Sequence, residues 1–285
     1  MSRLPSIVAL YPLRAVARAG MALFYPMSRV RSRPAVLGRE GDLVAERDPL
    51  RPSGRLLRDG HMDASYVDLA DPTHLEFDYM RWMRIVLRAA QAHRVVHVGG
   101  GACALARALA ADDPGGRQEV CEIDAQVLTL AREHLGLRRE RGLRVRLTDG
   151  REFIAGQAGA SWDAVVIDAF VAATVPRRLI TAEALADVAR IAPLGLVNVV
   201  DNRAARDVRT IAAALSAAYP RVWTLGGRAG NTVLAGGGAG LDLRRIAASI
   251  AADPSPARLT GPEATSRLIG GTAPIRDEEV DVRGV

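Results

Sequence analysis

From residue 94 onward, short runs rich in β-branched residues alternate with longer stretches of helical periodicity. Strands joined by helices pair in parallel, because the crossover returns the chain to the same end of the sheet. The predicted strands are Arg94 to Val98, Gln118 to Ile123, Leu143 to Leu147, Ala164 to Asp168, Leu196 to Val200, Val222 to Leu225 and Thr232 to Ala235. The predicted helices are Ala102 to Ala111, Ala125 to Leu135, Arg151 to Ala155, Ala182 to Ile191 and Ala204 to Ala218. This order predicts an α/β, Rossmann-like fold with a mostly parallel seven-stranded sheet. The last two strands are too close in sequence for a crossover and should form an antiparallel hairpin.

The rest of the chain divides around this α/β unit. Residues 34–53 are rich in proline, glycine and charge without a sustained period, which predicts an irregular linker. Asp59-Gly60 is a turn signal between two strand-like pieces, and it predicts a small β-hairpin followed by a helix from Leu75 to Ala90. The expected units are a basic arm with linker (1–53), a hairpin with helix (54–90), the Rossmann-like domain (91–252) and a tail (253–285).

Composition removes several function classes. All 38 basic residues are arginine, with a net charge of +6, so Schiff-base lysine chemistry and a Walker A loop are excluded. Aromatic residues make up only 4% and the arginines are spread along the chain, which does not favour nucleic-acid binding. Two cysteines do not make a disulfide framework, so we expect a cytoplasmic protein. The basic arm is expected to pack on the core or on a partner subunit, such as that of a homodimer; contact with a membrane surface is a less favoured alternative.

Three glycines end the first predicted strand. Gly99, Gly100 and Gly101 stand directly before a helix, where residues without a Cβ let the backbone turn sharply and approach a ligand closely. The amides at the start of that helix favour a negatively charged ligand group. A glycine-rich turn at this place predicts a nucleotide-type or nucleoside-type site.

Acidic residues end the next three strands. Glu122 lies about 20 positions beyond the glycines, where Rossmann-like sites bind ribose hydroxyls. Asp149 is suited to accept a hydrogen bond from an adenine amine, with capping of the following helix as the alternative. Asp168 ends the fourth strand, and Asp124 is expected to cap a helix. The carboxyl ends of parallel strands share one edge, so these acids should meet at one cleft.

At this point the sequence resembles the spermidine-synthase family within the class I S-adenosylmethionine-dependent transferases. The matching motifs are Asp59-Gly60, Leu75-Glu76-Phe77-Asp78-Tyr79-Met80, Val98-Gly99-Gly100-Gly101, Glu122-Ile123-Asp124, Asp149-Gly150-Arg151 and Val166-Ile167-Asp168. The resemblance implies the class I methyltransferase fold and S-adenosylmethionine, or its decarboxylated form, as cofactor. Glu122 beside Ile123 would hold the ribose, Asp149 with Gly150 the adenine, and the glycine turn would pass under the methionine portion. Asp168 belongs to the same cleft.

The sequence also departs from this family at the polyamine site. Ala102 stands where the family carries an aspartate for the cofactor amine, and Asp168 is not followed by the second acid of the family motif. Asp63 stands in place of a glutamine. A polyamine needs carboxylates to compensate its buried charges. We therefore expect methyl or other non-polyamine group transfer to a small-molecule acceptor.

Two alternatives stay open: an aminopropyltransferase, and a non-catalytic cofactor-binding protein. In a catalytic protein, Asp168 would orient or deprotonate the acceptor, helped by Tyr79 or Asp63. The histidines lack metal-ligand spacing, so no metal is expected.

Overall fold

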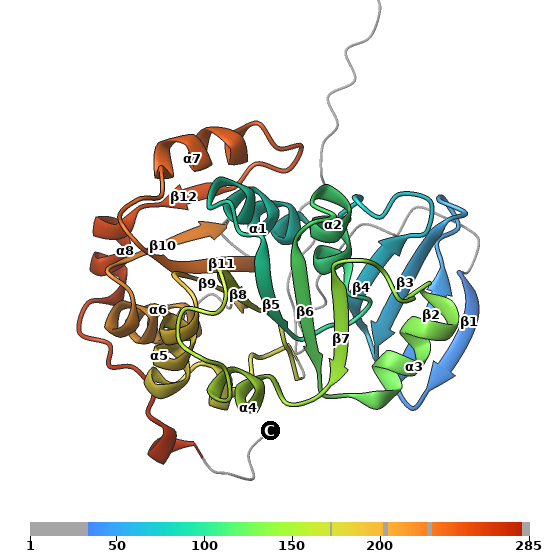
Figure 1. Ribbon diagram of the computed structural model, residues 1–285, viewed down its shortest axis with the longest axis horizontal. Coiled ribbons are helices and arrows are strands. Elements are labelled where there is room, and N and C mark those ends of the chain that lie inside the picture. Colours follow the sequence, from blue (N-terminus) through green and yellow to red (C-terminus); the bar gives the residue numbers. More distant parts are fainter. Residues whose placement is uncertain (1–33, 172, 202–204, 227–229, 281–285) are drawn as a thin grey trace, which may run out of the picture.

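The computed structural model of the protein describes residues 34–171, 173–201, 205–226 and 230–280. The basic arm at residues 1–33 and the end of the predicted tail at residues 281–285 lie outside the described residues. Two sheets stand side by side, with helices on both faces of the larger one (Figure 1).

The larger sheet has the order β12-β10-β11-β9-β8-β5-β6-β7. Its strands are β5 (Arg94–Val98), β6 (Arg117–Glu122), β7 (Leu143–Leu147), β8 (Ala164–Ile167), β9 (Leu194–Asp201), β10 (Arg221–Gly226), β11 (Gly230–Gly237) and β12 (Arg258–Thr260). Strands β9, β8, β5, β6 and β7 pair in parallel, and β10 and β11 form the antiparallel hairpin. The predicted Rossmann-like fold is confirmed. The sequence interpretation missed β12, because three residues carry no readable period.

Helices cover both faces of this sheet (Figure 1). One face packs against α1 (Asp78–Ala89), α2 (Ala104–Asp112), α3 (Ala125–His134) and α7 (Leu243–Ala251). The other face packs against α4 (Gly150–Ala155), α5 (Ala182–Ile191), α6 (Arg206–Ala218) and α8 (Pro262–Ile269). Two 3-10 helices, η1 (Arg177–Leu179) and η2 (Asp277–Glu279), lie near α5. Helix α8 and η2 lie in the segment that the sequence predicted as a tail.

The smaller sheet is a four-stranded antiparallel meander. It contains β1 (Ala35–Glu40), β2 (Leu43–Arg47), β3 (Gly54–Asp59) and β4 (Met62–Asp68). The predicted hairpin at Asp59-Gly60 is confirmed as β3 and β4. The prediction of an irregular linker over 34–53 is wrong, because β1 and β2 occupy most of it. Leu43 and Ala45 are buried in the main core, and Gly41 supplies the positive φ that the turn between the two strands requires.

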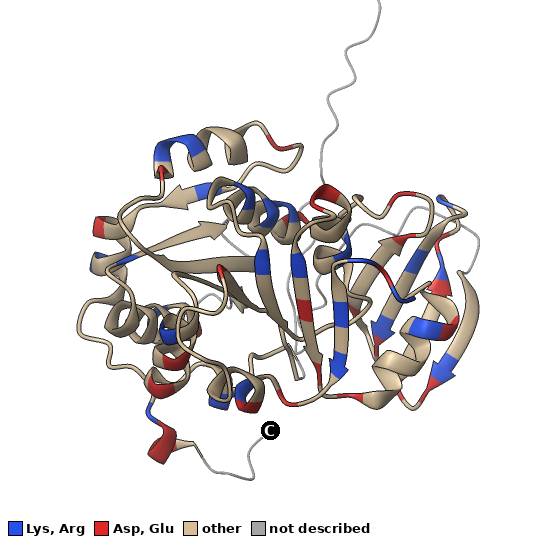
Figure 2. Ribbon diagram, viewed as in Figure 1, with Lys and Arg blue, Asp and Glu red and all other residues tan. Residues whose placement is uncertain are grey.

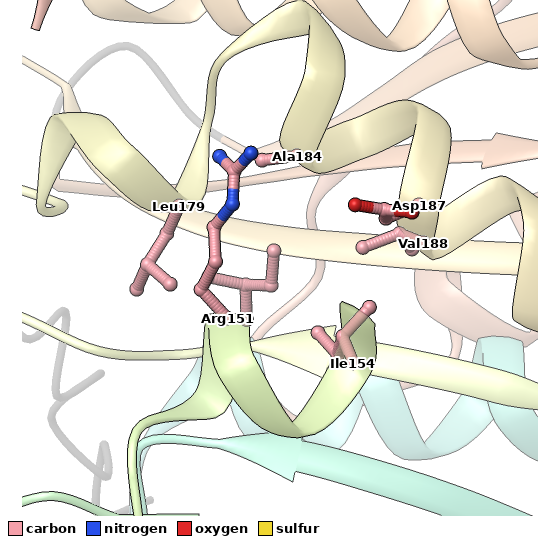
Figure 3. A pocket seen from close by; sticks show the side chains of 7 residues that line it. Arg151, Ile154, Leu179, Ala184, Asp187 and Val188 are labelled. Carbon is pink, nitrogen blue, oxygen red and sulfur yellow. The ribbon is translucent and has the colours of Figure 1, made fainter. Parts of the chain in front are cut away.

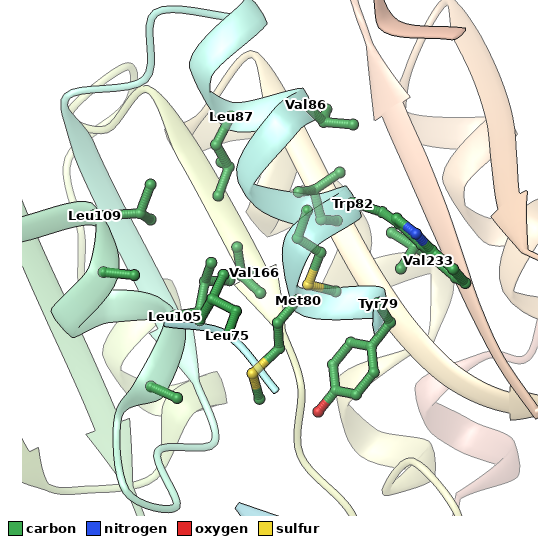
Figure 4. Close-up of a cluster of buried hydrophobic side chains, with 14 of the residues drawn as sticks. Leu75, Tyr79, Met80, Trp82, Val86, Leu87, Leu105, Leu109, Val166 and Val233 are labelled. Carbon is green, nitrogen blue, oxygen red and sulfur yellow. The ribbon is translucent and has the colours of Figure 1, made fainter. Parts of the chain in front are cut away.

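Helix α1 connects the two sheets through an apolar cluster (Figure 4). Met83, Val86 and Leu87 are fully buried beside Leu105 of α2. Burial of each such side chain stabilises the folded state by roughly 1.5–3 kcal/mol relative to leaving it exposed. Trp82 is buried and donates from Nε1 to the carbonyl oxygen of Ser255 (2.9 Å), so it belongs to the core. The cluster fixes the first turn of α1, which carries Tyr79, against the end of the main sheet.

Within the described ranges, the helices are all too short or too polar to cross a membrane.

Candidate functional site

The glycine turn after β5 is held in an unusual backbone conformation. Gly99 and Gly101 have φ values of +89° and +48°, which residues with a Cβ rarely adopt. A Cβ on Gly99 would overlap the carbonyl oxygen of Asp168. The ends of β5 and β8 therefore approach one another more closely than any side chain would allow.

Glu122 organises this turn from the end of β6. Its Oε2 accepts hydrogen bonds from the amides of Gly100 (2.8 Å) and Gly101 (3.1 Å), and its Oε1 accepts from the amide of Asp124 (2.9 Å). The carboxylate is 8% exposed. Three of its roughly four acceptor positions are thus occupied within the protein. The predicted ribose contact stays a prediction, and the structure adds that Glu122 also shapes the turn.

Neighbouring residues of the same strand end take different roles. Ile123 is 67% exposed, which leaves an apolar surface beside the carboxylate of Glu122. Asp124 caps α3 by accepting from the amide of Gln126 (2.7 Å), so the capping expectation is confirmed.

Asp149 follows β7 and caps α4. Its Oδ1 accepts from the amide of Glu152 (3.0 Å), and its Oδ2 pairs with Nη1 of Arg178 (2.8 Å) in η1. A Cβ on Gly150 would overlap the side chain of Val98, so this glycine lets α4 pack on β5. The capping alternative for Asp149 is confirmed, while its contact to adenine stays a prediction.

Asp168 lies between two polar side chains from distant elements. Its Oδ2 accepts from the hydroxyl of Tyr79 (3.1 Å), and its Oδ1 accepts from Nδ2 of Asn198 (2.8 Å) in β9. Burial raises the pKa of Asp168 to about 6, against the lowering effect of the two hydrogen bonds. Burial and the adjacent carboxylate raise the pKa of Tyr79 well above its ordinary value, so the phenol remains a donor.

The structure adds one residue, Asn198, to the site that the sequence predicted. Asn198 was missed, although a single polar residue inside the apolar run Leu194 to Val200 is a signal that could have found it. Asp63 lies on β4 and pairs with Arg58 of β3 (3.5 Å), while burial raises its pKa. Among the described residues it bonds to neither Tyr79 nor Asp168, so its catalytic role stays a prediction.

The smaller sheet reaches the glycine turn through Ser65. This buried side chain accepts from the amide of Ala102 (3.0 Å) and contacts the backbone at Gly101. Ala102 itself is fully buried in the apolar cluster of α1, which also contains Leu75, Met80 and Leu105 (Figure 4). The position that resembles the family's amine-binding aspartate therefore faces hydrocarbon.

Both cysteines are buried near the site. Burial raises the pKa of Cys103 and of Cys121 to about 12. Their thiols stay protonated at neutral pH, as expected for cysteines that serve only as packing residues. No group of three potential metal ligands occurs in the part of the chain that the structure describes.

A separate small pocket lies between α4, η1 and α5 (Figure 3). Ile154, Leu179 and Val188 line it, and Arg151 extends over it toward α5. The Arg151 guanidinium binds Asp277 of η2 (2.6 Å) and the hydroxyl of Thr181 (2.9 Å). None of the residues predicted for the cofactor lines this pocket, so we do not assign the cofactor to it.

Comparison with known proteins gives structural matches only. No protein-family model and no curated protein match the sequence. A probable spermidine synthase from Corynebacterium glutamicum is 26% identical, with a TM-score of 0.77 over 89% of this chain and 99% of that chain.

More distant structures share the fold. A spermidine synthase in complex with the transition state analogue AdoDATO is 16% identical, with a TM-score of 0.57 over 82% of this chain and 85% of that chain. Human methyltransferase-like protein 13 in complex with SAH is 18% identical, with a TM-score of 0.51 over 71% of this chain and 95% of that chain. The chain is therefore spermidine synthase-like in structure and has the Rossmann-like fold of the class I methyltransferases.

Proposed function

We propose that the protein binds S-adenosylmethionine, or its decarboxylated form, at the carboxyl edge of β5, β6, β7 and β8. We further propose that it transfers a methyl or other non-polyamine group to a small-molecule acceptor. The AdoDATO and SAH complexes of the two neighbours above support an adenosyl thioether as the ligand.

The hydrogen bonding of the glycine turn supports a nucleoside rather than a phosphate ligand. The amides of Gly100 and Gly101 bind Glu122, and the amide of Ala102 binds Ser65. A phosphate-binding turn needs such amides free for the ligand. Here a carboxylate occupies that position, and its charge repels phosphate while it accepts from neutral hydroxyl groups.

The burial of Ala102 is the observation that carries the non-polyamine assignment. A carboxylate at this position would bind an ammonium group of the cofactor, but the site presents a methyl group inside an apolar cluster. Because Ala102 stands in place of an aspartate, the site also lacks a negative charge that would repel the carboxylate of intact S-adenosylmethionine. Because both forms of the cofactor carry an ammonium group, only the second effect separates them, and it favours the intact cofactor.

Asp168 is the residue that we assign to the acceptor. With a pKa of about 6 it is mostly ionised at neutral pH, and it can accept a proton from an attacking oxygen or nitrogen. Asn198 and Tyr79 fix the carboxylate plane while each oxygen keeps a further acceptor position. When bound, the sulfonium cofactor supplies the electrophilic carbon, and the protein contributes alignment and the proton acceptor.

Aminopropyl transfer is the alternative, in which Asp168 would orient an amine instead of deprotonating a neutral acceptor. The exposed side chain of Val171, three residues after Asp168, gives a second ammonium group no carboxylate partner. A non-catalytic cofactor-binding protein is the second alternative.

Isothermal titration calorimetry tests the binding proposal. We expect S-adenosylmethionine and S-adenosylhomocysteine to bind, the decarboxylated cofactor to bind more weakly, and ATP not to compete. Preferential binding of ATP or NAD over S-adenosylmethionine and S-adenosylhomocysteine would overturn the assignment of the turn. Equal binding of the intact and the decarboxylated cofactor, with no group transferred to any acceptor, would favour the non-catalytic alternative.

A further inference from the structure

The loop before β7 and β7 itself form the most arginine-rich part of the chain. Five arginines fall within residues 138–146: Arg138, Arg139, Arg141, Arg144 and Arg146. The structure adds Arg117 from the neighbouring strand, and Figure 2 shows the basic residues following this edge of the sheet. Six of the 38 arginines are therefore gathered at this place. We call these six residues the arginine edge.

The arginine edge has more positive than negative charge. A single buried carboxylate, that of Glu119, faces Arg117 (2.9 Å), Arg144 (3.8 Å) and Arg146. Such a carboxylate offsets one of the three guanidinium charges. Arg144 is 63% exposed and Arg117 54% exposed, so both charges reach solvent.

The loop contributes three further charges. Arg138, Arg139 and Arg141 are exposed, and none forms an ion pair with another residue in the described ranges. The only acid between them, Glu140, lies 3.6 Å from the buried Nε of Arg107. The loop charges are therefore available to a ligand.

Two of the guanidinium groups lie over aromatic rings. The Arg117 guanidinium lies 4.6 Å from the centroid of the Trp162 ring, and the Arg146 guanidinium lies 5.6 Å from that of Phe153. Contact with a ring restricts the position of each guanidinium group. The planar fork of a guanidinium group matches the paired oxygens of a phosphate.

The strand geometry sets a regular spacing. Arg144 and Arg146 lie two residues apart on one face of β7, which places them about 7 Å apart along the strand. This is close to the separation of successive phosphates on an extended nucleic-acid strand.

Strand β7 is also the last strand of its sheet, so its outer amides have no partner in the sheet.

We propose that the arginine edge binds the phosphate backbone of single-stranded nucleic acid without sequence preference. A flexible strand can follow a row of arginines, and its contacts to phosphate carry no base information. Antiparallel pairing of β7 with a second copy would bring like charges together, which disfavours that occupant. Insertion into a membrane needs exposed apolar side chains, and on β7 only Leu147 is a strongly exposed one.

Fluorescence anisotropy with a labelled oligothymidylate of about 20 nucleotides tests the proposal. If all six arginines contact phosphate, a plot of the logarithm of the binding constant against the logarithm of the salt concentration should have a slope of about −4. We expect Arg141→Ser/Arg144→Ser to weaken binding at least tenfold at low salt and to reduce the slope by about 1.4. The other two arginines around Glu119 remain in this variant, so its melting temperature should match the wild type.

The matched control is Arg244→Ser/Arg245→Ser, which removes two exposed arginines from α7 at the opposite end of the sheet. We expect this control to bind like the wild type. An equal loss in both variants, equal binding of a duplex, or equal binding of polyglutamate or phosphatidylserine vesicles would each overturn the proposal. Cofactor binding by calorimetry is independent of these results, because none of the six arginines belongs to the proposed cofactor site.

Discussion

Asn198 donates a hydrogen bond from Nδ2 to Oδ1 of Asp168 over 2.8 Å, from a side chain that is itself fully buried in β9. The bond lowers the pKa of Asp168, while burial raises it. Because the second effect is larger, Asp168 titrates near pH 6 and its state depends on a residue that does not face the acceptor directly.

Asn198→Ala should therefore move the acidic limb of the rate profile. Loss of the donor raises the pKa of Asp168 above about 6, so the pH at which activity is half-maximal should rise. The check is kcat/KM for group transfer against pH in the two proteins. Asn198→Ala with an unshifted acidic limb would show that Asp168 does not set this pH dependence.

Asp168→Asn should change stability in a way that depends on pH. The folded protein binds the proton of Asp168 more tightly than the unfolded chain, because the pKa rises from 3.8 to about 6 on folding. The stability from this group is fully present below about pH 4 and is lost as the pH rises through 6. We expect the stability of Asp168→Asn relative to wild type to increase by about 1–3 kcal/mol between pH 4 and pH 7.

Urea unfolding at the two pH values measures this difference. A constant gap between the variant and the wild type would contradict the raised pKa. Asp163→Asn is a useful comparison, because burial raises the pKa of Asp163 but its hydrogen bonds outweigh burial and lower it. Its pH dependence should have the opposite sign and lie mainly below pH 4, so this comparison needs a further measurement at about pH 3.

Glu122→Ala should weaken cofactor binding by about 1–3 kcal/mol, since a charged acceptor is removed and the amides of Gly100 and Gly101 lose their partner. Glu122→Gln keeps one oxygen acceptor and should lose less affinity for the cofactor. Calorimetry with S-adenosylhomocysteine, with melting temperatures recorded beside it, separates binding from folding. Normal affinity in folded Glu122→Ala would leave Glu122 with a structural role alone.

Asp149→Ala should lower the free energy of unfolding by about 1 kcal/mol, because α4 loses its cap. Asp149→Asn retains an acceptor for the amide of Glu152 and should stay near the wild type. The pair with Arg178 contributes little, since the arginine is exposed and such pairs are worth at most about 1 kcal/mol. Chemical denaturation of both variants measures the contrast, and equal losses would show that the ion pair dominates instead of the cap.

The sequence was most informative where a local pattern decides the structure. Strands Arg94 to Val98 and Leu143 to Leu147 and helix Ala182 to Ile191 have the predicted bounds, because their β-branched runs or apolar periods are continuous. Strands β1, β2 and β12 escaped prediction. Strand β12 is very short, and β1 carries charged residues along an exposed edge, so its pairing depends on tertiary contacts.

The same distinction holds for the site. The strand ends carrying Glu122, Asp149 and Asp168 could be placed from the alternation of strands and helices alone. The partners of Asp168 could not, because Tyr79 and Asn198 come from elements 89 and 30 residues away along the chain. Burial of Ala102 likewise depends on how α1 packs against the sheet, and no local sequence pattern predicts that packing.

Turnover of putrescine tests most directly whether this cleft serves a non-polyamine acceptor. With saturating decarboxylated cofactor, we expect little or no spermidine, because each missing charge-assisted contact costs about 1.5–3 kcal/mol and two are missing. Formation of spermidine at about one turnover per second or faster, the ordinary range of enzymes, would contradict this account and establish aminopropyl transfer.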